Sequence, residues 1–206
     1  MSEIDVKVNY GKLKELVKKM SKNYTVKVGL LSDKAGKKGK KGSDDVENST
    51  DIDYAGLGAV QEFGCDIKIT PKMAAFLAIQ AKELGLPKLE KDSDGYVHIP
   101  ARSFLQMPLT RKNAVINELR NQLGKASKEE IIDYITRSKD GLLTLAVMLG
   151  ASAVEVVMQA FDTSGWGEWE PDSPLTVAMK GSNKPLQDKG NLQGAITFEV
   201  KENGKS

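Results

Sequence analysis

The sequence predicts a single α+β domain over residues 1–206, in which a small, mostly antiparallel sheet packs against two long helices. Its length of 206 residues fits one domain that buries about 70% of its unfolded surface. Short β-branched segments predict strands, and longer stretches with apolar residues at helical spacing predict helices. The predicted strands are 25–31, 96–100, 195–200 and a candidate at 66–70, and the two long helices are 105–123 and 142–161.

The cysteine and histidine content excludes several kinds of site. A lone cysteine, Cys65, cannot form an intrachain disulfide, and with one histidine, His98, it cannot make a single-chain His/Cys zinc site. The first residues lack the apolar stretch behind a basic start that marks a secretory signal. We therefore expect a soluble protein made in a reducing cytoplasm, with no cofactor and no metal.

The start of the chain is basic. Residues 1–43 carry twelve lysines against four acidic residues, a net charge of +8, so the rest must carry −6 to give the total of +2. Apolar residues at helical spacing predict a helix over 11–20, and the strand at 25–31 follows it.

A Lys/Gly-rich run at 34–42 lies within a polar segment, 32–52, that has almost nothing to bury. Such a segment is typical of a flexible loop insertion. Lysines neutralise phosphates, but the run holds no arginine or aromatic residue to read or stack on bases. It is therefore either a solvated loop or a non-specific DNA contact. The DNA-contact candidates are Lys34, Lys37, Lys38, Lys40 and Lys41.

Two helices are predicted in the next part of the chain. The first covers 54–63, with Gly64 available just beyond its C-terminus. Thr70 as N-cap and Pro71 at the first helical position open the second, which covers 71–84. Because this second helix is apolar nearly all round, it should be buried or face a partner subunit.

The later helices carry different signals. Pro108 makes the start of the helix at 105–123 ambiguous, and the pair Ser127 and Glu130 forms a capping box that opens a further short helix. The stretch 142–161 is the most apolar of the chain. Because Glu155 interrupts it, we expect a buried core helix and no membrane partner.

No sequence motif carries catalysis. A Gly-x-Gly pair at 56–58 could begin a dinucleotide-binding loop, but Gln61 stands where the third glycine belongs. His98 lies in the middle of a strand, where a structural histidine is expected. Nothing in the sequence fixes a base beside Cys65. We expect a non-enzymatic protein, and a hydrolase that uses Cys65 or His98 is the enzymatic alternative.

The segment 162–193 combines both tryptophans with turn residues and little regular pattern. It predicts an extended arm. Aromatic residues beside Met and Lys on such an arm are typical of an interface, which makes Trp166 and Trp169 candidates for subunit contact. The alternative is that both tryptophans cover the edge of the core.

An ordered set of short motifs spans about residues 24–200. They are Val26–Gly29, Tyr54–Ala55 with Gln61–Gly64, Ile69–Leu77, Ile99–Leu105, Trp169, Leu175–Thr176 with Lys180–Ser182, and Lys184–Leu192. In this order they resemble the tailed-phage virion-morphogenesis proteins, also called tail-completion or neck proteins. The set is most specific at EFG, IPARSF and KPLQDKGNL. Two departures are a longer connection after the first strand and Lys189, which stands where the family has threonine; Gly190 still suits a turn with positive φ.

The resemblance implies a non-enzymatic, structural role at the junction of head and tail in a phage virion. Copies would form a ring, a hexamer or dodecamer, assembled in the host bacterial cytoplasm. Its neighbours would be a portal or adaptor protein on one side and tail terminator or tail tube proteins on the other. The Lys-rich loop would then be able to meet packaged DNA.

A ring formed by a heterologous interface needs two different complementary patches on each subunit. Arg102 is a candidate donor of an intersubunit ion pair, because a guanidinium suits buried interface carboxylates. The alternative places Arg102 in solvent beside a strand end, with Phe104 anchoring the helix. The interface candidates are Glu62, Phe63, Gly64, Arg102, Phe104, Trp166, Trp169, Lys180, Lys184, Pro185, Leu186, Gly190 and Leu192.

Overall fold

A computed structural model describes residues 18, 23–31, 54–86, 95–124, 126–138 and 140–203. The α+β class is confirmed. Apart from Lys18, which is helical, the predicted helix at 11–20 lies outside the described residues, as does the predicted loop insertion at 32–52. The helices are α3 (Tyr54–Phe63), α4 (Pro71–Glu83), α5 (Gln106–Thr110), α6 (Lys112–Gln122), α7 (Lys128–Arg137), α8 (Gly141–Asp162), α9 (Pro174–Lys180) and α10 (Asn191–Ala195), and the strands are β1 (Asn23–Leu30), β2 (Cys65–Lys68), β3 (Tyr96–Ile99) and β4 (Ile196–Asn203).

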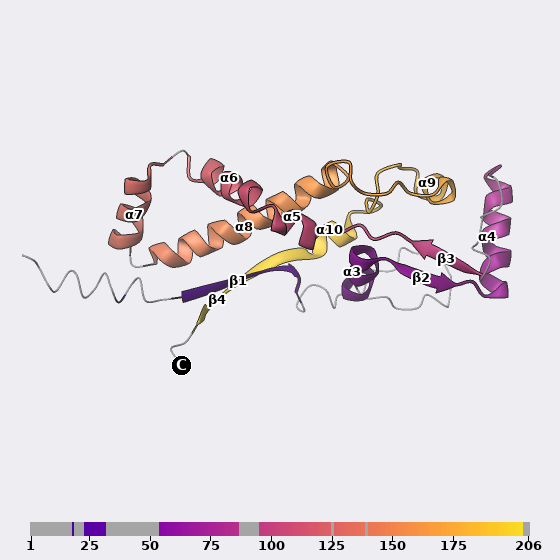
Figure 1. Cartoon of the computed structure of the whole chain (residues 1–206), viewed down its shortest axis with the longest axis horizontal. Helices are drawn as coiled ribbons and strands as arrows, with labels where there is room; N and C mark the ends of the chain where they lie inside the picture. The colour runs from indigo at the N-terminus through magenta and orange to yellow at the C-terminus, as the bar shows by residue number, and fades with distance from the viewer. Residues whose placement is uncertain are drawn as a thin grey trace, which may run out of the picture.

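Helix α8 runs through the middle of an elongated body (Figure 1). Helices α5, α6 and α7 pack against it, and so do strands β1 and β4. These strands pair antiparallel, from Asn23 opposite Asn203 to Leu30 opposite Ile196. The main core lies where the C-terminal half of α8 meets the segments on either side of it. Its buried residues are Phe104, Val157, Ala160, Phe161, Trp169, Leu192 and Ile196.

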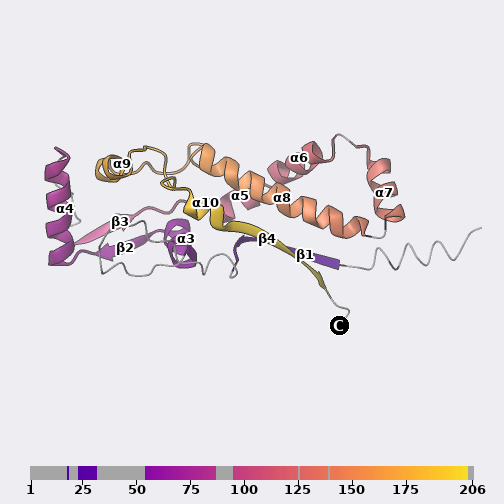
Figure 2. The same cartoon turned by 180° about the vertical axis from the view of Figure 1, so that it is seen from behind.

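A second part of the molecule projects from the body. Beyond α3 the chain runs out along β2, forms α4 and returns along β3, and we call β2, α4 and β3 the distal arm. Strands β2 and β3 pair antiparallel, with Cys65 opposite Ile99 and Lys68 opposite Tyr96. Both views place α4 at the far end of the molecule from α7 (Figures 1 and 2).

The predicted single sheet is wrong, because the strands form two separate two-stranded sheets. Strand propensity describes how well a residue fits a pleated surface. It does not determine which other strand the segment pairs with. The segment predicted at 66–70 pairs with β3 in the distal arm, whereas β1 pairs with the C-terminal strand on the body.

The predicted helix at 105–123 is two helices, α5 and α6, separated at Arg111 with ψ of 65°. The backbone amides at the start of α5 donate hydrogen bonds to the carboxylate of Glu62 at the end of α3, whereas α6 packs along α8. The chain changes direction between these two constraints.

Other predicted helices are confirmed. The helix expected at 54–63 has these bounds, and α4 starts at Pro71 with the Thr70 hydroxyl accepting a hydrogen bond from the Met73 amide. The capping box of Ser127 and Glu130 is present at the start of α7.

Helix α8 agrees with the core helix predicted at 142–161. Among the described residues it is the one helix long and apolar enough to cross a membrane, and 39% of its most apolar window is buried inside the protein. Val156, Val157, Ala160 and Phe161 point into the core.

The segment 162–193 differs from the extended arm predicted for it. A series of turns at 163–168 follows α8, and two short helices, α9 and α10, come next. Trp169, Leu175 and Leu192 are buried against the chain's own core. The segment therefore packs on its own body along this stretch.

Candidate functional site

The carboxylate of Glu62 closes the junction between α3 and α5. Glu62 is buried at the end of α3, and its oxygens accept hydrogen bonds from the backbone amides of Phe104 (2.8 Å), Leu105 (2.9 Å) and Gln106 (2.9 Å). The Ser103 hydroxyl also donates to it at 2.6 Å. These amides are the unpaired donors at the start of α5, so the glutamate caps that helix from another element.

The guanidinium of Arg102 ties the segment after Trp169 to the same junction. Its Nε donates to the carbonyl of Glu170 at 2.7 Å, and its Nη2 donates to the carbonyl of Pro171 at 3.0 Å. Nη2 also lies 3.2 Å from a carboxylate oxygen of Asp172, and both side chains are about 6–7% exposed. The planar guanidinium suits this fan of acceptors.

Lys180 extends the network into the last motif. Its ammonium pairs with the second oxygen of Asp172 and donates to the carbonyl of Lys184 at 2.6 Å. The Gln187 amide then donates to the carbonyl of Phe161 at 2.6 Å, at the end of α8. A chain of polar contacts therefore runs from Arg102 to α9 and the following loop, and a separate contact joins that loop to α8.

Aromatic packing lies beneath this network. The centroid of the Phe161 ring lies 5.5 Å from that of Phe104 and 5.6 Å from that of Trp169. Phe161 and Trp169 are arranged edge to face. The Trp169 indole donates to the carbonyl of Ser103 at 3.2 Å. Trp169 thus has its polar group satisfied while its ring fills the core.

Two glycines form turns beside these contacts. Gly64 has φ of 70°, and a Cβ there would lie 2.7 Å from the carbonyl oxygen of Ile99. Gly190 has φ of 73° and immediately precedes α10, which confirms the positive φ expected there. Only glycine adopts such a conformation without strain.

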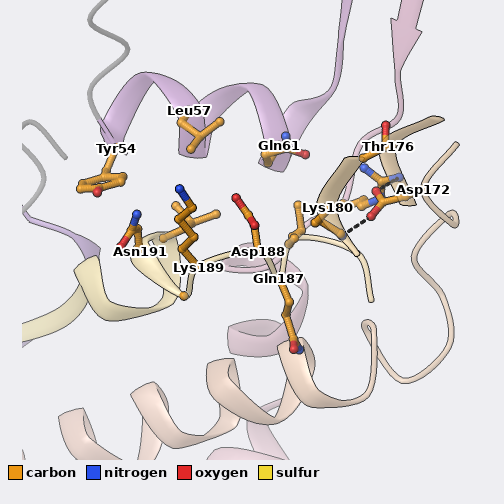
Figure 3. Close-up of a pocket in the computed structure, with 14 residues that line it drawn as sticks. Tyr54, Leu57, Gln61, Asp172, Thr176, Lys180, Gln187, Asp188, Lys189 and Asn191 are labelled. Atoms are coloured by element: carbon orange, nitrogen blue, oxygen red, sulfur yellow. Dashed lines mark hydrogen bonds and ion pairs between the residues drawn. The ribbon is translucent and has the colours of Figure 1, made fainter. Parts of the chain in front are cut away.

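We call Glu62, Arg102, Ser103, Trp169, Asp172, Lys180 and residues 184–192 the motif cluster. A cleft of about 260 Å³ lies beside it, with Tyr54, Leu57 and Gln61 of α3 on one side and the loop from Gln187 to Asn191 on the other (Figure 3). The side-chain oxygen of Gln61 is buried here without a hydrogen-bond partner.

Most of the predicted interface residues fall into two groups, one buried and one accessible, while Gly64, Lys180 and Gly190 are half-buried. Phe104 is fully buried, and Glu62, Arg102, Trp169, Pro185 and Leu192 are also buried in their own chain. Arg102 is thus neither solvent-exposed nor free to donate an intersubunit ion pair, because its carboxylate partner is Asp172 of the same chain. Of the alternatives considered, burial against the core is confirmed for Trp169, and a role as a buried anchor is confirmed for Phe104.

The second group remains accessible. Phe63 is exposed beside Gly64, and Lys184 is exposed at the start of its loop. Leu186 and Trp166 are half-buried, and the guanidinium of Arg111 stacks 4.3 Å from the Trp166 ring. The lysines predicted to contact DNA, Lys34, Lys37, Lys38, Lys40 and Lys41, all lie outside the described residues.

Sequence reasoning missed Asp172 and Ser103 as members of the cluster. Asp172 lies just before the Ser173–Pro174 start of α9, and no spacing rule connects it with a residue seventy positions earlier. Ser103 lies within the motif IPARSF, but only the three-dimensional structure reveals that its hydroxyl makes two hydrogen bonds. It donates to Glu62 and accepts from the Met107 amide at 2.9 Å.

The described residues show no assembled catalytic pair of Cys65 and His98. The register places Cys65 opposite Ile99 and Asp66 opposite His98, so the two side chains lie on opposite faces of the sheet. His98 Nδ1 lies 2.7 Å from Asp66 on the exposed face. Among the described residues no group of three or more His, Cys, Asp or Glu could hold a metal ion.

Comparison with known proteins adds no relative. No family model matches the chain, and neither the curated proteins nor the solved structures give a significant match.

Proposed function

We propose that this chain is a structural subunit of a tailed-phage virion. It acts at the head–tail junction, in a neck or tail-completion ring that connects or seals head and tail. One observation supports this most: the motifs EFG, IPARSF and KPLQDKGNL, far apart in sequence, meet in one cluster. Glu62 binds the backbone of 104–106, Arg102 binds Asp172, and Lys180 joins Asp172 to Lys184. The three most specific motifs of the resemblance therefore contribute to one network of contacts.

The shape of the molecule agrees with a subunit of an assembly. A body built on α8 and a projecting distal arm give the chain surfaces that face in different directions (Figure 1). Large apolar side chains are exposed on both, including Phe76 on α4 and Ile116 on α6. Contiguous apolar exposure marks a site of association more often than a free surface.

Deletion of the coding sequence from the phage or prophage tests this proposal. We expect DNA-filled heads and complete tails to accumulate separately, because the component that joins them is missing. Supply of the intact chain from a plasmid should restore joined particles. Normal, infectious virions without this chain would contradict the proposal.

A DNA-binding module is the alternative proposal, supported by the net charge of +8 over residues 1–43. A gel-shift titration at several salt concentrations separates it from a ring subunit that makes no DNA contact. A lysine-mediated contact should weaken steeply with salt, and replacement of Lys34, Lys37, Lys38, Lys40 and Lys41 by serine should remove that dependence. Unchanged DNA affinity, DNA retention and virion assembly in the serine variant would exclude a role for these lysines.

A further inference from the structure

The distal arm carries an apolar ridge that no described part of the chain covers. Met73, Phe76 and Ile79 follow one another at intervals of three residues along α4 and are 37%, 53% and 56% exposed. Side chains at this interval form a continuous ridge on a helix surface. Among the described residues, the helix expected to be buried or to face a partner therefore leaves Met73, Phe76 and Ile79 exposed to solvent.

The hairpin of β2 and β3, which leads to and from α4, also carries apolar residues that the described chain leaves partly uncovered. In its register Cys65 faces Ile99 and Ile67 faces Val97, so these four residues share one face of the sheet. Ile67 is itself partly exposed. Among the described residues, β2 and β3 pack essentially with each other. A two-stranded sheet alone is at best marginally stable in water, so this arm gains stability from a partner.

The body carries an apolar groove. It lies between β1, α6 and α8, has a volume of about 390 Å³, and includes Val28, Val115, Ile116 and Leu149 in its lining. Ile116 is 44% exposed and Leu149 36% exposed. Lys112 is its one charged lining residue. A groove between helices and a strand accepts the ridge of another helix.

A chain cannot fill its own groove with its own arm. Helix α4 lies at one end of the molecule, and β1, α6 and α8 form the body toward the other end (Figures 1 and 2). The arm is also tied to the body on both of its connections, through Glu62 before β2 and through Arg102 after β3. The described part of the chain therefore leaves both surfaces uncovered.

We propose that the ridge of α4 in one copy packs into the groove between β1, α6 and α8 of the next copy. A second copy is the occupant that accounts for both surfaces with one contact, because each chain supplies one ridge and one groove. Such a head-to-tail contact either closes into a ring or propagates as a filament. This inference rests on the proposed ring function and names the contact that would build it.

The size of the contact requires the hairpin as well as the helix. A specific interface buries about 800 Å² on each partner. Helix α4 has 13 residues and is about 20 Å long, so its ridge alone is too narrow for such an area. We expect the face of the β2–β3 hairpin that carries Ile67 and Val97 to supply the remainder.

Two variants separate the halves of the contact. The arm variant Phe76→Asp/Ile79→Asp loses the ridge and keeps the groove, whereas the groove variant Ile116→Asp loses the groove and keeps the ridge. All three positions are about half exposed, so each variant should fold. We expect both to be monomers by light scattering, with self-association at least tenfold weaker than that of the intact chain.

Mixing the two variants is the decisive step. An equimolar mixture contains one intact ridge and one intact groove that can meet, so we expect a dimer that cannot grow further. The matched control Ile132→Asp alters a 51% exposed isoleucine on α7, outside both surfaces, and should assemble like the intact chain. Circular dichroism confirms that each variant is folded.

The outcomes discriminate among the alternatives. A mixture that stays monomeric overturns the head-to-tail contact. A groove variant that assembles normally beside a monomeric arm variant also overturns it, because assembly then does not depend on the groove. If both variants assemble normally the contact is wrong while the ring function stands. Absence of the intact chain from virions contradicts the ring function itself.

Discussion

The carboxylate of Glu62 shows how one residue joins separate elements. Its two oxygens receive four donors within 2.9 Å, three of them backbone amides at the start of α5. The sequence marks this position only as an acidic residue in a short motif. Its task depends on where Phe104 and its neighbours lie in space, and no local pattern records that.

Glu62→Gln should destabilise the protein by about 3 kcal/mol. The glutamine side chain keeps one acceptor oxygen, but an NH2 donor replaces the other. This donor faces backbone N–H groups, so buried donors are left unpaired. Urea denaturation measures the change. The matched control is Glu155→Gln on α8, where the side chain is exposed, and we expect a change within about 0.5 kcal/mol there. Equal effects at both positions would show that the cap contributes nothing.

Arg102→Lys tests the attachment of the segment 170–184. Lysine keeps the charge but cannot reach Glu170, Pro171 and Asp172 together, so we expect a loss of about 2 to 3 kcal/mol. Limited proteolysis should cut this segment faster than in the intact chain. Arg120→Lys on the exposed side of α6 is the control. Unaltered cleavage in Arg102→Lys would contradict the assigned role of the guanidinium.

At the scale of elements, local sequence signals predicted the bounds of helices better than they predicted which strands pair. The bounds of α3, α4 and α8 followed from apolar spacing and caps such as Thr70. The pairing of β2 with β3, and of β1 with β4, depends on contacts distant in sequence and was not predicted. Helices α9 and α10 were missed because a segment rich in turn residues gave no periodic signal.

The corner between α3 and β2 requires glycine for two reasons. Gly64→Ala combines a left-handed backbone with a Cβ 2.7 Å from the Ile99 carbonyl oxygen, and we expect a loss of about 3 kcal/mol. Gly124→Ala has a similar φ of 65° but nothing within 4 Å of its Cβ, so about 1 kcal/mol is expected. Thermal unfolding of the two variants measures the difference. Equal losses would mean that the corner relaxes around the methyl group.

The capping box of α7 gives a pH-dependent contribution. The Ser127 backbone amide, and then its hydroxyl, hold the pKa of Glu130 below the ordinary glutamate value. A lowered folded-state pKa means that this contribution is present above the unfolded pKa and is lost as pH falls through the folded value. Carbon-13 NMR titration should place the Glu130 pKa below 4.5, and Ser127→Ala should raise it. A Glu130 pKa unchanged by Ser127→Ala would contradict the contribution of the hydroxyl, because the variant keeps the backbone amide.

For the whole molecule, the sequence predicted the α+β class but not the division into body and distal arm. The basic segment 34–42 and, apart from Lys18, the predicted helix at 11–20 lie outside the described residues, so their roles stay predictions. Most of the residues expected at subunit interfaces instead hold the chain together. Among the described residues, α4 and the groove beside α6 carry exposed apolar surfaces, and these are the surfaces that we propose meet a second copy.

The mass of the assembly formed by the intact chain, in solution and in purified virions, tests the ring function most directly. One chain has a mass of 22.4 kDa. We expect a closed species of six or twelve chains, and its presence at the head–tail junction of virions. A protein that stays a 22.4 kDa monomer at every concentration and is absent from virions would contradict this function.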